Sequence, residues 1–241
     1  ALFTALGQAV KPLLAPYLAP DALETRATTH HVLARINKNW AAKVSGPYYD
    51  YYWGAFYRER LSRQTDAQLF VNMWPEELRF GFYMGEYAKD ARFRQGVQGD
   101  PGTLYNLIVD LGLLDNFRFE RRIPDGRRET LSVASPDDLR QWIATGDYNL
   151  LQYLSPEEAV HLGPALVDRV FDAFHRVFPV YLWAILDEPA PVVERYLAAE
   201  FPTDDIDDEE LGSPPMPYTL ANFTSETHLT DATAAELRAL L

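Results

Sequence analysis

Residues 67–86, "AQLFVNMWPEELRFGFYMGE", contain two apolar runs on either side of the turn sequence "WPEE". In both runs, large apolar residues occupy every second position: Leu69, Val71 and Met73 before the turn, and Leu78, Phe80 and Phe82 after it. A period of two is typical of strands that bury one face, and a short proline-containing turn between two such runs favours antiparallel pairing. This stretch therefore predicts a β-hairpin.

Residues 117–133, "FRFERRIPDGRRETLSV", predict a second hairpin, with a cationic tip around Pro-Asp-Gly. Apolar periodicity predicts helices over residues 23–44, 86–96 and 102–114, and after the Ser-Pro pairs at positions 135 and 155. Serine followed by proline and acidic residues is the expected chemistry of a helix start. The helix that ends near Leu186 is apolar on more than one face, which predicts a central buried helix. The predicted fold class is α+β, mostly helical, with two β-hairpins forming a small antiparallel sheet.

The charge distribution divides the chain. Its net charge is −13, but residues 26–133 carry 16 Lys+Arg against 13 Asp+Glu, whereas residues 134–241 carry 5 against 20. Six of those acidic residues lie in "TDDIDDEELGSPPMP", which has few apolar residues to bury. We predict a compact α+β recognition domain over residues 1–200, an acidic proline-containing linker over 201–217, and a further segment over 218–241.

Composition also bears on the compartment. The hydrophobic fraction of 47% is ordinary for a globular protein, and the chain has no cysteine, which suits a reducing compartment. The apolar start is interrupted by Lys11 and three prolines, and no uninterrupted apolar run reaches the length of about 18 residues that a membrane span needs. We expect a cytoplasmic protein with no membrane partner. The first residue is not methionine, which favours a longer natural chain.

Motifs for catalysis are scarce. The five histidines show no metal-binding spacing, and "GDPGTLYN" at residues 99–106 lacks the Gly-Lys-Ser/Thr of a phosphate loop. No Gly-x-Ser-x-Gly elbow is present, and Glu76 and Glu77 lie on a hairpin turn, where solvated carboxylates are the simpler interpretation. We predict no metal site, no cofactor and no enzymatic activity for this fragment.

The last 25 residues, "PYTLANFTSETHLTDATAAELRALL", carry Tyr-Thr-Leu at 218–220, Thr227, Leu229, Glu236 and Leu237. They resemble the segment that leads into the motor domain of McrB-type AAA+ restriction proteins. The resemblance implies that residues 1–200 are an N-terminal DNA-recognition domain, followed by a GTPase or ATPase motor ring and served by a separate nuclease subunit. In such families the recognition domain turns a methylated cytosine out of the duplex into an aromatic pocket. The Walker motif lies outside this chain, and residues 1–200 match no family by eye.

An aromatic block at residues 48–57, "YYDYYWGAFY", is the candidate for such a pocket. On a helix, its rings would form two adjacent stripes, wider than one core face needs. One interpretation is that one stripe lies in the core and the other packs against the hairpin; the other is that some rings stack on a planar base. The candidates for base stacking or base-edge contacts are Trp40, Tyr49, Tyr52, Trp53, Tyr57, Asn39 and Asp50.

Cationic residues flank the block and could contact phosphates. The candidates are Lys38, Lys43, Arg58, Arg60, Arg63, Arg92, Arg94, Arg121, Arg122, Arg127 and Arg128. The DNA-binding hypothesis requires these side chains to form one continuous basic face beside an open aromatic pocket. The alternatives are a non-catalytic module of an AAA+ system that senses a protein or small molecule, which the overall acidity also suits, and a free-standing enzyme of unfamiliar chemistry.

Overall fold

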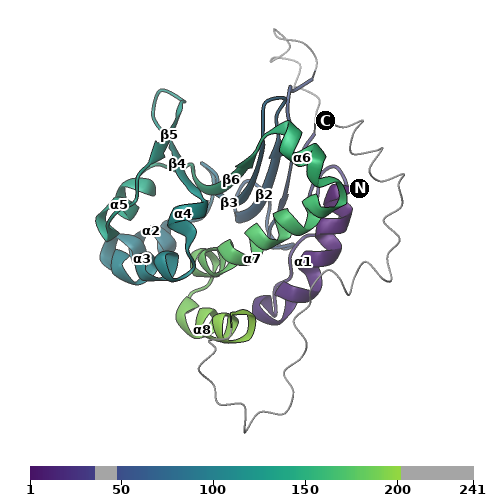
Figure 1. The fold of residues 1–241 in the computed structure, drawn as a ribbon. Coiled ribbons are helices and arrows are strands. Elements are labelled where there is room, and N and C mark those ends of the chain that lie inside the picture. The colour runs from purple at the N-terminus through teal and green to yellow at the C-terminus, as the bar shows by residue number, and fades with distance from the viewer. Residues whose placement is uncertain (36–47, 202–241) are drawn as a thin grey trace.

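The computed structural model describes residues 1–35 and 48–201 (Figure 1). Its strands are β1 (Tyr52–Phe56), β2 (Ala67–Met73), β3 (Leu78–Met84), β4 (Arg118–Arg122), β5 (Arg128–Leu131) and β6 (Tyr148–Leu154). Its helices are α1 (Leu2–Leu18), α2 (Ala91–Gly99), α3 (Pro101–Asp110), α4 (Leu113–Asn116), α5 (Pro136–Trp142), α6 (Pro156–Leu162), the 3-10 turn η2 (Gly163–Ala165), α7 (Leu166–Ile185) and α8 (Pro189–Glu200).

The strands form one six-stranded sheet in the order β1-β2-β3-β6-β4-β5, and every neighbouring pair is antiparallel. The α+β class and both hairpins are confirmed, but two hairpins do not make up the whole sheet. Strand β6 joins the two hairpins, because it pairs with β3 on one side and with β4 on the other. Strand β1 pairs with the outer edge of β2. The sequence analysis missed β6 because "YNLLQYL" is a short apolar run without clear alternation.

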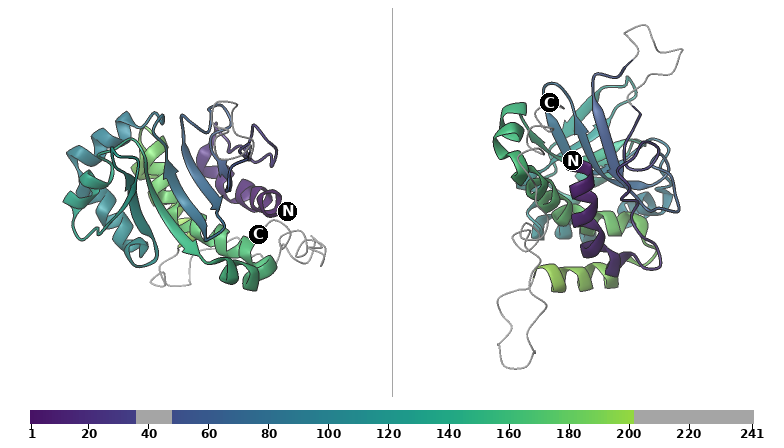
Figure 2. Two further views of the ribbon diagram at one scale, coloured as in Figure 1. Left: turned by 90° about the horizontal axis from the view of Figure 1, so that it is seen from above. Right: turned by 90° about the vertical axis from the view of Figure 1, so that its right-hand side faces the viewer.

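One face of the sheet is covered by helices. Figures 1 and 2 show α7 lying along the sheet with α1 beside it, and α7 contacts β2, β3 and α1. The core between them includes the alternate residues Leu69, Val71, Phe80 and Phe82 of the first hairpin, which are fully buried. The central buried helix is thus confirmed as α7, although it begins at Leu166, after two short helical segments.

Trp142, at the end of α5, fixes the smaller helices to the join between the two hairpins. It is fully buried, and its indole N–H donates to the carbonyl oxygens of Glu120 in β4 and Asn149 in β6, at 3.1 and 3.0 Å. The predicted starts of α5 and α6 are confirmed, since Ser135 and Ser155 each form a capping box. These caps satisfy backbone N–H groups that a helix leaves unpaired.

Residues 52–56 of the aromatic block form strand β1, so a helix over the block is wrong. In β1, residues alternate between the two faces, and Gly54 lies against α1, where the Phe3 ring occupies the place of a missing Cβ. Tyrosine, tryptophan and phenylalanine favour strands, and pairing with β2 decides the outcome. Within residues 23–35 no helix forms either: Leu33 instead bridges to Gly54. The rest of that predicted helix lies outside the described residues.

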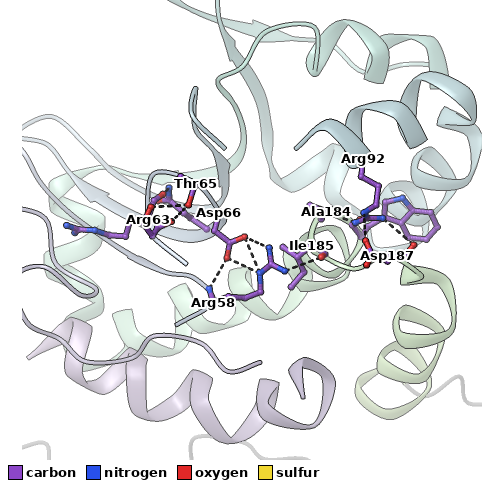
Figure 3. A network of polar contacts seen from close by, with 11 residues as sticks. Arg58, Arg63, Thr65, Asp66, Arg92, Ala184, Ile185 and Asp187 are labelled. Atoms are coloured by element: carbon purple, nitrogen blue, oxygen red, sulfur yellow. Dashed lines mark hydrogen bonds and ion pairs between the residues drawn. The ribbon is translucent and has the colours of Figure 1, made fainter. Parts of the chain in front are cut away.

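Two arginines hold the carboxyl end of α7 (Figure 3). Arg58 forms an ion pair with buried Asp66 at 2.6 Å and donates to the carbonyl oxygen of Ile185 at 3.3 Å. Arg92 donates to the carbonyl oxygens of Trp183 and Ala184, at 3.4 and 3.3 Å. Cations at a helix C-terminus satisfy its free carbonyl groups and oppose its dipole. The helix end is therefore tied to the loop between β1 and β2 and to α2.

No helix within residues 1–35 and 48–201 is long and apolar enough to cross a membrane. The predicted linker at 201–217, apart from Phe201, and the segment at 218–241 lie outside the described residues. The division of the chain into those parts stays a prediction.

Candidate functional site

The second face of the sheet carries a row-by-row mixture of aromatic, cationic and amide side chains. Because facing residues share a side, the register gives one row as Trp53, Asn72, Arg79 and Tyr153, and a parallel row as Gln68, Tyr83, Asn149 and Glu120. Between the two rows, the strand residues Ala55, Phe70 and Leu151 form a small apolar cluster with Tyr57, which follows β1. We call this side the open face.

A cavity of about 460 Å³ lies on the open face. Its lining comes from β1, β2, β3 and β6 and from the β4–β5 hairpin, which brings Arg122, Gly126 and Arg128 to its edge. The other lining residues are Tyr51, Trp53, Phe70, Asn72, Trp74, Arg79, Tyr83, Asn149 and Leu151. The sheet thus brings together rings and cations that are as much as 77 positions apart in the chain, from Tyr51 to Arg128.

Guanidinium groups lie over the rings of the open face. Arg63 lies 5.0 Å from the Trp53 ring, Arg79 lies 5.6 Å from the rings of Trp74 and Tyr153, and Arg128 lies 5.7 Å from Tyr83. Ring pairs continue the surface, with Phe70 and Tyr83 stacked at 4.9 Å. Planar cations and aromatic rings both stack on heterocycles, so the open face suits a flat ligand.

Some of these charges are neutralised and others are not. Arg79 pairs with Glu77, and Arg128 pairs with Asp147 at 2.9 Å. Arg63 donates to a backbone carbonyl at 3.3 Å, but among the described residues it has no ion pair with a carboxylate. Burial lowers the pKa of Arg63, although an arginine stays charged at neutral pH. An incoming anion would compensate that partly desolvated charge.

Several polar atoms at the cavity have no hydrogen-bond partner among residues 1–35 and 48–201. The side-chain oxygens of Asn72 and Asn149 and the indole N–H of Trp74 are buried without a hydrogen bond, and all three residues line the cavity. Asn149 is 1% exposed. A buried polar group without a hydrogen bond costs about 1 to 3 kcal/mol, so these positions favour a ligand that offers both donors and acceptors.

Tyr83 contributes a neutral hydroxyl to this surface. Burial, together with the charge of Asp147, raises the pKa of Tyr83 to about 12. The phenol therefore keeps its proton at neutral pH and acts as a hydrogen-bond donor rather than as a base. Burial also raises the pKa of Tyr153, whose hydroxyl donates to Glu120 at 2.6 Å. Within residues 1–35 and 48–201, no group of three or more acidic, histidine or cysteine side chains could hold a metal.

The candidates for base contacts do not all lie at the cavity. Trp53 lines the cavity, whereas Tyr52 lies on the helix-covered face, 5.9 Å from the Phe3 ring. Tyr57 is 5% exposed, and its hydroxyl donates to a backbone carbonyl at 3.4 Å. The exposed residues Tyr49 and Asp50 precede β1. Asn39 and Trp40 lie outside the described residues, as do the cationic candidates Lys38 and Lys43.

The predicted phosphate contacts are not gathered into one face. Arg122 and Arg128 line the cavity, and Arg63 lies beside it. The remaining arginines have other contacts: Arg58 and Arg92 hold α7, Arg60 pairs with Asp21, Arg94 with Asp90, Arg121 with Glu129, and Arg127 with Asp125. Within the described residues, the predicted cations therefore do not form the single continuous basic face that the DNA-binding hypothesis required.

The candidates predicted from the sequence do not include five residues that line this cavity: Arg79, Tyr83, Asn72, Asn149 and Trp74. The first hairpin was interpreted through its apolar residues, and the signal lay in the alternate ones: Gln68, Phe70, Asn72, Arg79 and Tyr83 share the opposite face. Aromatic, amide and arginine side chains that alternate along a strand with the apolar core residues indicate a binding surface on the opposite face of the sheet.

Comparison with protein-family models and with curated proteins finds no match to this chain. The likeness of residues 218–241 to McrB-type proteins therefore stays a prediction from those residues.

Proposed function

We propose that the open face binds nucleic acid, with one unpaired base in the cavity and neighbouring phosphates on the arginines around it. The observation that carries the proposal is the composition of one cavity: stacked rings, guanidinium groups, and buried amide and indole groups that have no hydrogen-bond partner in the described part of the chain. Bases supply a flat surface and an edge of donors and acceptors, and the backbone supplies anions. No catalytic role is proposed for this fragment.

The expected affinity of a single domain is modest. A stacked base contributes about 1 to 3 kcal/mol. Arg118 and Arg122 are exposed cations of the open face, and Arg63 is a half-buried one without a carboxylate partner among the described residues. Three phosphate contacts correspond to a salt slope of about −2 for a single strand. If residues 218–241 lead into a motor ring, linked copies would raise the effective concentration at one DNA. We propose such a motor, with a separate nuclease subunit, as the setting of this domain.

Fluorescence anisotropy with labelled oligonucleotides tests the proposal. Single strands, matched duplexes, and duplexes with methylated cytosine are titrated with the 241-residue protein between about 50 and about 200 mM salt. We expect Trp53→Ala to weaken binding by about tenfold or more through the lost ring, and Arg122→Gln to reduce the salt slope by about one. Arg60→Gln, which removes a cation away from the cavity, is the matched control.

The result that overturns the proposal is an absence of binding to every oligonucleotide at low salt. Equal losses for Arg60→Gln and Arg122→Gln would also overturn it, because general charge would then explain the binding. Tighter binding to the methylated duplex would identify the modified base as the one that enters the cavity.

A second candidate is a small-molecule sensor, and the cavity volume favours it. About 460 Å³ falls within the usual range for small ligands. Adding a free mononucleotide to the same titration separates the two functions. If a mononucleotide displaces the labelled oligonucleotide at a similar concentration, the result supports the small-molecule sensor, because the flanking phosphates then contribute no affinity.

A further inference from the structure

A second cavity, of about 310 Å³, lies on the helix-covered side of the sheet, between the middle of α7 and the end of β6. Its wall includes Gln152 from β6 and Arg169, Asp172 and Arg176 from α7. This site is separate from the open face, because Gln152 pairs with Phe80, whose side chain points into the helix-covered core.

Gln152 is a polar residue where the strand otherwise buries apolar groups. Its neighbours on the same face of β6, Leu150 and Leu154, pack in the core, yet the buried Gln152 side-chain oxygen has no hydrogen bond to any residue that the structure describes. The residue is 5% exposed and lines the cavity. An unpaired buried amide is unfavourable, so a donor held in the cavity would compensate it.

Arg169 and Arg176 are two turns apart on α7 and line the same cavity. Within the described part of the chain, neither forms an ion pair with a carboxylate, although Asp172 lies between them on the helix. The charged side chains that line the cavity are thus two guanidinium groups and one carboxylate, and His175, which also lines it, pairs with Glu200 at 3.3 Å. They suit a ligand that has an anionic group and, beside it, hydroxyl groups that donate to Asp172 and Gln152.

We propose that this cavity binds a small hydroxylated phosphate monoester, with the phosphate on Arg169 and Arg176 and the hydroxyls on Asp172 and Gln152. Asp172 repels a bare phosphate ion, so the hydroxyl contacts are needed for affinity. The polar character of the wall selects a hydrophilic molecule over an apolar one.

Isothermal titration of the 241-residue protein with ribose 5-phosphate tests this site. We expect saturable binding that Arg176→Gln and Gln152→Leu each weaken by about fivefold or more. Gln152→Leu removes a buried unpaired amide from an apolar face, so it is expected to remain folded, which circular dichroism checks. Arg195→Gln on α8 and Trp53→Ala on the open face are controls, and both are expected to bind normally.

Three results would overturn the proposal. The first is an absence of binding heat with ribose 5-phosphate up to about 10 mM, because the dissociation constant would then exceed that concentration. The second is equal affinity for inorganic phosphate, which would leave the hydroxyl contacts without a role. The third is unchanged binding in the double variant Arg169→Gln/Arg176→Gln.

Discussion

The variant Arg58→Met tests whether Arg58 stabilises the fold or contacts phosphate. The Asp66 carboxylate is 2% exposed, and the Arg58 guanidinium, 21% exposed, reaches it at 2.6 Å while also holding the end of α7 (Figure 3). Methionine keeps most of the side-chain volume and the backbone N–H that bonds Asp66 at 2.9 Å, but it removes the positive charge. Breaking a buried pair leaves an uncompensated charge, which costs about 3 to 5 kcal/mol of unfolding free energy.

Urea unfolding followed by circular dichroism measures this loss. With an m-value of about 3 kcal/mol/M, the midpoint falls by about 1 to 1.7 M. Asp66→Asn in the Arg58→Met background removes the stranded charge and keeps an acceptor, so we expect the double variant to be more stable than Arg58→Met alone. The matched control is Arg60→Met, whose exposed pair with Asp21 at 3.6 Å is expected to contribute less than about 1 kcal/mol.

The reasoning is refuted if Arg58→Met unfolds at the same urea concentration as the parent. It is also refuted if Arg58→Met is stable but loses nucleic-acid binding, since Arg58 would then contact phosphate, as its sequence neighbourhood suggested. If Asp66→Asn does not restore stability in the Arg58→Met background, the Asp66 carboxylate is not the source of the lost unfolding free energy.

Four further predictions concern folding. Trp142→Phe removes the indole N–H that serves two carbonyl groups and should lower the unfolding free energy by about 1 to 3 kcal/mol in urea titrations. Gly81→Ala places a Cβ 2.4 Å from the Leu150 carbonyl oxygen at a φ of +146°, so we expect loss of soluble protein or a melting temperature many degrees lower. Ser155→Ala removes a capping box and should cost about 1 kcal/mol, seen as a small drop in melting temperature. Burial lowers the pKa of His175, so the unfolded chain binds a proton at a higher pH than the folded chain does. The unfolding free energy should therefore fall as the pH drops below about 6.5. In urea titrations at several pH values, His175→Phe should make this fall of the midpoint smaller.

Local signals predicted the parts of the fold that depend on neighbouring residues. The period of two in residues 67–84, the Pro-Asp-Gly turn and the Ser-Pro helix starts all act over a few positions, and the structure has the hairpins and capping boxes there. The aromatic block was misinterpreted because rings at consecutive positions fit either period. Its strand state comes from pairing with β2 across an intervening loop.

The candidate site was less predictable than the fold. The sequence selected Trp53, Arg122 and Arg128, which line the cavity, but both of these arginines lie near Asp147, at 4.0 and 2.9 Å. Arg58, Arg92 and most of the other chosen cations have partners away from the cavity. Whether an arginine is free or paired depends on which carboxylate or carbonyl group folding brings near it, and charge patterning along the chain does not contain that information.

By itself, the sequence determined the α+β class, the two hairpins, the capped helix starts and the buried helix α7, because each follows from residues within about two turns or one hairpin of each other. Only the tertiary structure decided that β6 joins the hairpins, that Arg58 meets the carbonyl of Ile185 at a separation of 127 positions, and that rings and amides from four strands line one cavity. Those contacts arise from packing over long sequence distances, where a residue's role is set by its neighbours in space.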